Sequence, residues 1–117
     1  MGYLASIDFV KSVFTEAIEV NTVASVDMAG TYLLIDNVEK YNDVQDKITF
    51  VLVVASNTLT GKTGVMDKLE DYRTRILNNR FIVNFDFIKR IEMQSGTLFS
   101  VAFVFSMLTN LTQEFNQ

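Results

Sequence analysis

Two apolar segments rich in β-forming residues lie near the end of the chain, at 81–93 and 98–108, and flank the turn sequence Gln94-Ser95-Gly96-Thr97. This pattern predicts two antiparallel strands joined as a hairpin. The second strand contains no charged residue, and both of its faces are suited to burial. One face carries Phe99, Val101, Phe103, Phe105 and Met107, and the other carries Leu98, Ser100, Ala102, Val104, Ser106 and Leu108.

A strand with no solvent-exposed face must be packed against other residues on both faces of its sheet. A chain of 117 residues has room for two substantial helices, which can shelter one face. We therefore expect a neighbouring subunit to cover the other face, where Ser100, Ala102 and Ser106 make a small, smooth surface.

Two segments have the periodicity of amphipathic helices. The first runs from about residue 6 to residue 20, with Ser6 as its expected N-cap. The second begins after Gly64 and ends at Asn78-Asn79. On its outer face Asp71 and Arg75 have the four-residue spacing of a helical ion pair. Its predicted buried stripe consists of Val65, Leu69, Tyr72, Ile76 and Leu77.

Two more segments are rich in β-forming residues. Residues 31–38 predict a strand that stops at the charged sequence following Val38. Residues 47–56 are almost continuously apolar, which is typical of a central strand covered on both faces. The pattern in 21–30 is weak and fits either a loop or a short edge strand.

These elements predict a single α+β domain over residues 1–117. Their order is α-β-β-α-β-β, two hairpins each preceded by a helix. We expect one antiparallel four-stranded sheet with both helices on one face. Residues 110–117 are expected to be a flexible or docking tail.

Composition removes several classes of function. The chain has no cysteine and no histidine, so it lacks the usual thiol nucleophile, general base and metal ligands. Its net charge is −4, which disfavours nucleic-acid binding. The uncharged stretch 93–113 alternates like a strand and does not predict a membrane span, and the N-terminal sequence does not match a signal peptide. We expect no catalytic residue, no cofactor and no metal, and therefore not an enzyme.

Two segments resemble ligand-binding motifs, but each also fits an ordinary loop. Residues 56–63 follow a strand and end in Gly61-Lys62-Thr63, as a phosphate-binding loop does, but Ser56 stands where that motif needs glycine. A plain strand-to-helix loop is favoured. The acidic residues Asp36, Glu39, Asp43 and Asp46 lack the dense spacing and glycine of a calcium loop, so a solvated loop is favoured there too.

Half of the basic residues lie within a short part of the chain. They are Arg73, Arg75, Arg80, Lys89 and Arg90. They are expected to form one basic edge where the second helix meets the third predicted strand. This edge is either ordinary surface or a subunit contact, in which Arg would pair with carboxylates such as Asp43 or Asp46 of a neighbour.

The order of elements resembles the small tail-terminator (tail-completion) proteins of tailed bacteriophages and prophages. The features that carry the resemblance are the N-terminal helix, the strand 31–38, the uncharged strand 50–56, the helix around Leu69, Arg73 and Leu77, and the return hairpin from Glu92 through Gly96 to Phe103. The resemblance implies a structural subunit of a homo-oligomeric ring, commonly a hexamer. Such a ring caps the tail tube and docks to the head connector, and it belongs to the virion tail assembled in the bacterial cytoplasm.

A different class of function fits the same pattern. A small α+β ligand-binding or enzymatic domain would use the open face of the sheet as a pocket, because aromatic and small residues on one face suit an apolar ligand equally well. Sedimentation distinguishes the two classes, because only the ring protein is required to self-associate.

Overall fold

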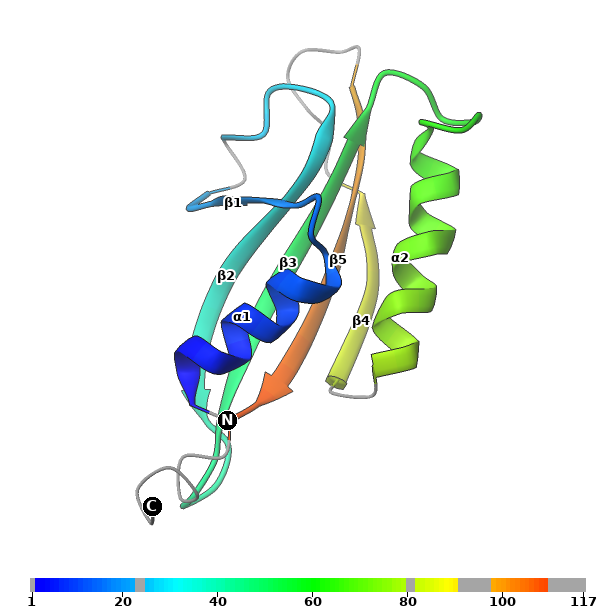
Figure 1. Ribbon diagram of the computed structural model, residues 1–117. Helices are drawn as coiled ribbons and strands as arrows, with labels where there is room; N and C mark the ends of the chain where they lie inside the picture. Colours follow the sequence, from blue (N-terminus) through cyan, green and yellow to red (C-terminus); the bar gives the residue numbers. More distant parts are fainter. Residues whose placement is uncertain (1, 23–24, 80–81, 91–97, 110–117) are drawn as a thin grey trace.

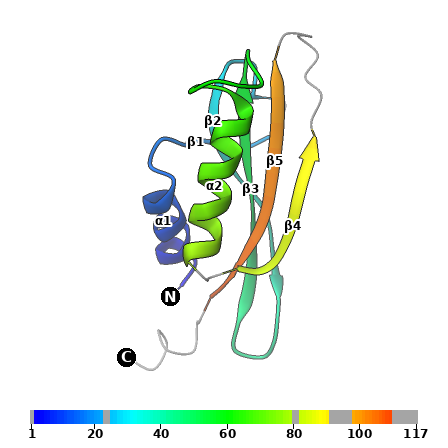
Figure 2. The ribbon, with the colours of Figure 1, turned by 90° about the vertical axis from the view of Figure 1, so that its right-hand side faces the viewer.

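The computed structural model describes residues 2–22, 25–79, 82–90 and 98–109. Both helices lie on one face of a single sheet, as Figures 1 and 2 show. An α+β fold is therefore confirmed, and so is the placement of both helices on one face. Along the chain the elements are α1 (Tyr3–Val13), β1 (Ile18–Val20), β2 (Gly30–Lys40), β3 (Asp46–Ser56), α2 (Val65–Asn79), β4 (Ile82–Arg90) and β5 (Phe99–Leu108).

The sheet is mixed and five-stranded, in the spatial order β1-β2-β3-β5-β4. The short strand β1 pairs in parallel with β2, Ile18 lying opposite Tyr32, while the other three pairings are antiparallel. The prediction of an entirely antiparallel sheet of four strands is thus wrong, because it lacks β1. The predicted order α-β-β-α-β-β is wrong for the same reason, because a third strand precedes α2.

The first helix is shorter than predicted and begins earlier. Gly2, in extended conformation, is its N-cap, whereas Ser6 lies buried inside the helix. The helix ends because Phe14 leaves helical geometry, with φ −117° and ψ 65°, and its ring enters the core. Residues 18–20 are then free to extend along β2. Their composition favours this outcome, because the β-branched residues Ile18 and Val20 are good strand formers.

Strands β2 and β3 form a long antiparallel hairpin, close to the bounds predicted from the sequence. The register shifts between Ile35 and Asn37, which indicates a bulge at Asp36. Beyond this point the hairpin extends past the ends of both helices (Figure 2). We call residues 38–46 the hairpin tip.

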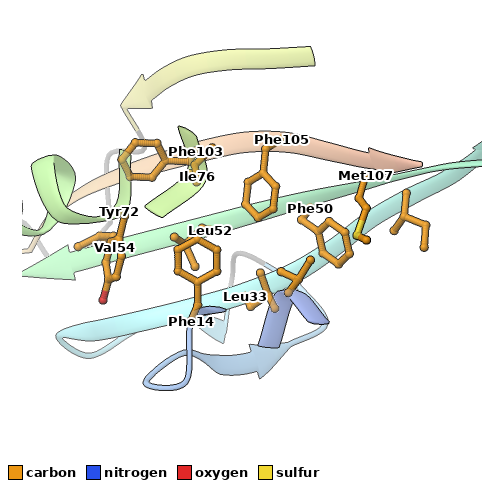
Figure 3. Packing of buried hydrophobic residues seen from close by; sticks show 12 residues of the cluster. Phe14, Leu33, Phe50, Leu52, Val54, Tyr72, Ile76, Phe103, Phe105 and Met107 are labelled. Carbon is orange, nitrogen blue, oxygen red and sulfur yellow. The ribbon is translucent and has the colours of Figure 1, made fainter. Parts of the chain in front are cut away.

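The main core lies between the helices and the sheet. Leu33, Leu52 and Phe103 are neighbours across β2, β3 and β5, and all three are buried. The rings of Phe50 and Phe105 stack with centroids 5.5 Å apart, as Figure 3 shows. Each buried side chain of this size contributes about 1.5–3 kcal/mol, so this layer holds both helices on the sheet. The cluster consists of Val10, Phe14, Leu33, Ile48, Phe50, Leu52, Val54, Tyr72, Ile76, Phe103, Phe105 and Met107.

The opposite face of the sheet is partly covered by the chain itself. Val26, in the connection from β1 to β2, is 1% exposed and packs with Tyr32, Val53, Ala55 and Ala102. Val20 and Val51 lie against the same cluster. At this end of the face the cover comes from the segment around Val26, and a neighbouring subunit is not required there.

The predicted strand 81–93 is present as β4 over Ile82–Arg90 and pairs with β5. The predicted turn 94–97 and the predicted tail 110–117 lie outside the described residues.

Candidate functional site

A pocket of about 510 Å³ opens at the end of the sheet where β3 leads into α2. Thr31, Val54 and Ser56 contribute to its lining from the sheet. Glu16 contributes from the connection between α1 and β1, and Lys68 contributes from α2. The rest of the lining includes Asn57, Thr58 and Thr63 of the loop before α2. A pocket of this size can accept a small ligand or a protruding side chain.

The two charged residues of the pocket differ in their surroundings. Glu16 Oε1 lies 2.7 Å from Arg75 Nη1, so its charge is compensated. Lys68 Nζ lies 5.9 Å from the centroid of the Tyr72 ring, and no carboxylate in the described part of the chain is within ion-pair distance of it. The pocket therefore presents an uncompensated positive charge.

Arg75 connects both helices. Its Nη1 donates to the Val13 carbonyl at 3.2 Å, which satisfies a carbonyl at the end of α1 that the helix leaves open. Its Nη2 lies 2.8 Å from Asp71 Oδ2, as the four-residue spacing predicted. The guanidinium also lies 5.1 Å from the Tyr72 ring centroid. This arginine is a structural link between α1 and α2.

Burial raises the pKa of Tyr72 to about 12, and the nearby Glu16 carboxylate adds to this increase. The pKa of Glu16 lies below its ordinary value. Partial burial raises that pKa, but hydrogen bonds from its own backbone, Tyr72 and Arg75, together with the charge of Arg75, outweigh burial. Tyr72 is thus held neutral and Glu16 is held ionised.

The loop that resembles a phosphate-binding motif is closed on itself. Ser56 Oγ donates to the Thr63 carbonyl at 2.8 Å and accepts from the Thr58 amide at 3.2 Å. At the start of α2, the amides of Gly64, Val65 and Met66 donate to the carbonyls of residues 61, 58 and 59 respectively. The plain strand-to-helix loop favoured from the sequence agrees with this arrangement.

The described residues of the predicted basic edge lie on α2 and β4, which contact each other. Arg75 points toward Glu16 and the end of α1, and its guanidinium is engaged there. Arg73 is exposed on α2. Lys89 and Arg90 lie on β4 opposite Ala102 and Val101. Arg80 lies outside the described residues.

The predicted acidic partners lie in the hairpin tip, where they make contacts within the chain. Asp43 pairs with Lys40 at 3.2 Å, and Glu39 pairs with Lys47 at 3.0 Å. Asp46 accepts a hydrogen bond from the Tyr3 hydroxyl. Asp43 is nevertheless almost fully exposed.

The three small residues expected at a subunit contact are buried within the single chain. Ser100, Ala102 and Ser106 are each 3% exposed. Ala102 packs in the cluster with Val26, and the Ser106 hydroxyl lies 3.0 Å from that of Thr49 on β3. On this face Val51, Val104 and Leu108 are only partly buried.

Among the described residues, no group of three or more acidic side chains is arranged to hold a metal ion. Within the same part of the chain, the helices are too short or too polar to cross a membrane.

Comparison with known proteins finds no family model that matches the sequence and no curated protein with significant similarity. The candidate site is therefore argued only from the structure of this chain, because no relative supplies site residues.

Sequence reasoning missed the pocket and the Glu16–Arg75 pair. Asp71 is visible as a partner of Arg75 because the two lie one helical turn apart. Glu16 is separated from Arg75 by 59 residues, so no local pattern connects them. The only sequence signal for the pocket is the glycine-containing loop 57–64, which lies at its edge.

Proposed function

We propose that the protein is a structural subunit that assembles with copies of itself into a closed ring, of the kind that caps the tail tube of a bacteriophage or prophage and docks to the head connector. The observation that carries this proposal is the hairpin tip. It projects beyond the two-layer body (Figure 2). It also carries large apolar side chains that are about half exposed. These are Val38, Tyr41 and Val44, which are 49%, 51% and 48% exposed.

Tyr41 and Val44 lie in the turn itself, and Val38 lies in β2 just before it. Large apolar side chains gathered at a protruding turn are a feature of interaction surfaces, because a solvated turn is normally polar. The overall dimensions of 50 × 26 × 21 Å describe an elongated subunit. An elongated subunit with an apolar end is suited to contacts with neighbours in an assembly.

Self-association is tested by measuring mass in solution for the wild-type chain and for Val38→Thr/Tyr41→Ser/Val44→Thr. Wild type should form a species of several subunits, and the tip variant should remain folded and monomeric. The matched control replaces exposed apolar residues elsewhere, as Leu4→Ser/Met28→Ser/Leu77→Ser, and should assemble as wild type does. A monomeric wild type at high micromolar concentration contradicts the proposal.

Ligand binding is a second candidate, favoured by the pocket with its uncompensated Lys68. This pocket lies at the end of the sheet beside α2, whereas the sequence suggests the open sheet face. A monomer whose melting temperature rises with citrate as an anionic probe, and no longer rises in Lys68→Ala, would favour this function over assembly.

A further inference from the structure

We infer that the hairpin tip of one copy binds at the pocket of the next copy, so that the subunits associate head to tail. The inference rests on the proposed self-assembly and identifies the two surfaces that meet. The first surface is the hairpin tip, and the second, the pocket end, consists of the pocket together with residues 57–68.

These two surfaces lie at opposite ends of the same molecule. Strand β3 begins at the tip with Asp46 and ends at the pocket with Ser56. Eleven residues of strand span roughly 36 Å at about 3.3 Å per residue. The tip therefore cannot reach the pocket of its own chain, and any contact between them joins two copies.

The tip is organised before it binds. The amides of Tyr41 and Asn42 both donate to the Gln45 carbonyl at 3.1 Å. The Asn42 side chain donates to Gln45 Oε1 and accepts from the Val44 amide, each at 3.0 Å. These four bonds fix the turn that presents Tyr41 and Val44, so little conformational entropy is lost when it docks.

The pocket end offers apolar surface for such a docking element. The loop exposes Leu59 by 47%, and the first turn of α2 exposes Met66 by 54%. Methionine adapts its shape to a partner at low cost. The pocket beside them has Val54 and Ala55 in its lining and is open enough to admit an aromatic side chain such as Tyr41.

Charge at the two ends is complementary. Residues 36–47 contain four carboxylates and two lysines, a net charge of −2. Residues 57–68 contain Lys62, Lys68 and a single carboxylate, a net charge of +1. Glu16, which also lines the pocket, pairs with Arg75, and Arg75 pairs with Asp71 as well. Opposite net charges favour tip-to-pocket encounters over tip-to-tip encounters.

Different surfaces meet in this contact, so it is heterologous and continues from one copy to the next. It forms the proposed ring when the rotation between successive copies closes. A tip of a few residues buries less than the roughly 1,600 Å² of a typical stable interface. A single contact is therefore weak, and closure stabilises the ring because every copy then makes two contacts.

The chain contains no cysteine, so contacts can be located with introduced pairs. Val44→Cys places a thiol on the tip, and Asn57→Cys places one at the pocket. Asn78→Cys is the matched control, since Asn78 is also an exposed asparagine and lies near the far end of α2. Equal mixtures of two single-cysteine proteins are oxidised, and mixed disulfide-linked dimers are measured by mass spectrometry.

The mixture of Val44→Cys with Asn57→Cys should give mixed dimers on the order of tenfold above the mixture of Val44→Cys with Asn78→Cys, because docking raises the effective concentration of the two thiols. The double variant Val44→Cys/Asn57→Cys should give a ladder of linked oligomers. Equal yields in the two mixtures overturn the head-to-tail contact. If wild type still assembles, that result leaves the proposed ring intact and moves its interface elsewhere; if wild type is monomeric, both proposals fail.

Discussion

The hydroxyl oxygens of Thr31 and Tyr72 lie 2.7 Å apart, and both residues are buried. This bond ties the start of β2 to the middle of α2. Phe14 packs edge-on against the same tyrosine, with ring centroids 5.7 Å apart, so the end of α1 meets both elements there. Tyr72 is visible among these neighbours in Figure 3. The two helices and the sheet are thus joined at one residue beside the pocket.

Tyr72→Phe should reveal the burial of this tyrosine in the pH dependence of stability at alkaline pH. Folded Tyr72 has a pKa of about 12, above its ordinary value, so between these two pH values the unfolded state loses the proton and the folded state keeps it. The free energy of unfolding of the wild type therefore falls as pH rises above about 10, by about 1.4 kcal/mol for each pH unit until the folded pKa is reached. Urea titrations at pH 8 and pH 11 should show this fall in wild type and a smaller fall in the variant.

At pH 8 the same variant should cost about 1 kcal/mol, because the Thr31 hydroxyl loses its partner. Tyr41→Phe is the control, since Tyr41 is half exposed in the hairpin tip. If Tyr72→Phe keeps the full alkaline loss, the assignment of that loss to Tyr72 is incorrect.

Glu16→Gln should reduce the loss in free energy of unfolding that occurs as the pH becomes acidic. The folded pKa of Glu16 is below its ordinary value, so the carboxylate stabilises the fold above that ordinary value, and the contribution disappears as pH falls through the folded pKa. Because the side chain is about one-third exposed, solvent screening limits the effect to below about 1 kcal/mol. Chemical denaturation from pH 7 to pH 3 measures it, and an unchanged slope in the variant would argue against the Glu16–Arg75 pair in solution.

Gly64→Ala should destabilise the fold by about 1–3 kcal/mol. A Cβ atom at Gly64 would come within 2.6 Å of the Thr60 carbonyl carbon and 2.8 Å of the Leu59 carbonyl oxygen, and neither backbone atom can move without opening the loop. Gly61→Ala is the comparison, since that Cβ meets nothing within 4 Å. Its φ of +97° alone should cost about 1 kcal/mol. Equal thermal melts for the two variants would contradict the loop geometry.

Val26→Ala tests whether the chain covers its own far sheet face. Removing two methyl groups from a side chain that is 1% exposed should cost about 1–2 kcal/mol. Met28→Ala, two residues away and 68% exposed, should change stability by less than about 0.5 kcal/mol. Guanidinium titrations at low protein concentration compare the two, and similar small effects would mean that the segment around Val26 does not cover this face in solution.

The long strands and α2 could be predicted from the sequence because their patterns are local. Residues 47–56 are almost continuously apolar, and in the structure they lie in the central strand β3. The end of α1 could not be predicted because Ala17 and Ile18 continue the helical stripe, although packing of Phe14 in the core stops the helix. No local pattern indicates this, since the rings that receive Phe14 belong to Tyr72 and Phe105.

The site is less predictable for a similar reason. Burial of Ala102 within the single chain could not be predicted, because the weak pattern of 21–30 gives no sign that Val26 packs against it. The contact of Arg75 with Glu16 could not be predicted either, because Glu16 is remote in sequence. Asp43 in the hairpin tip remains a predicted partner residue, now expected to face the basic pocket end of a neighbouring copy.

Mass in solution by sedimentation velocity, over a range of micromolar concentrations, tests the central claim most directly. We expect a discrete species whose mass is a multiple of 13.3 kDa and which reverts to monomer in the Val38→Thr/Tyr41→Ser/Val44→Thr variant. A wild-type chain that sediments at 13.3 kDa at every concentration would contradict the account.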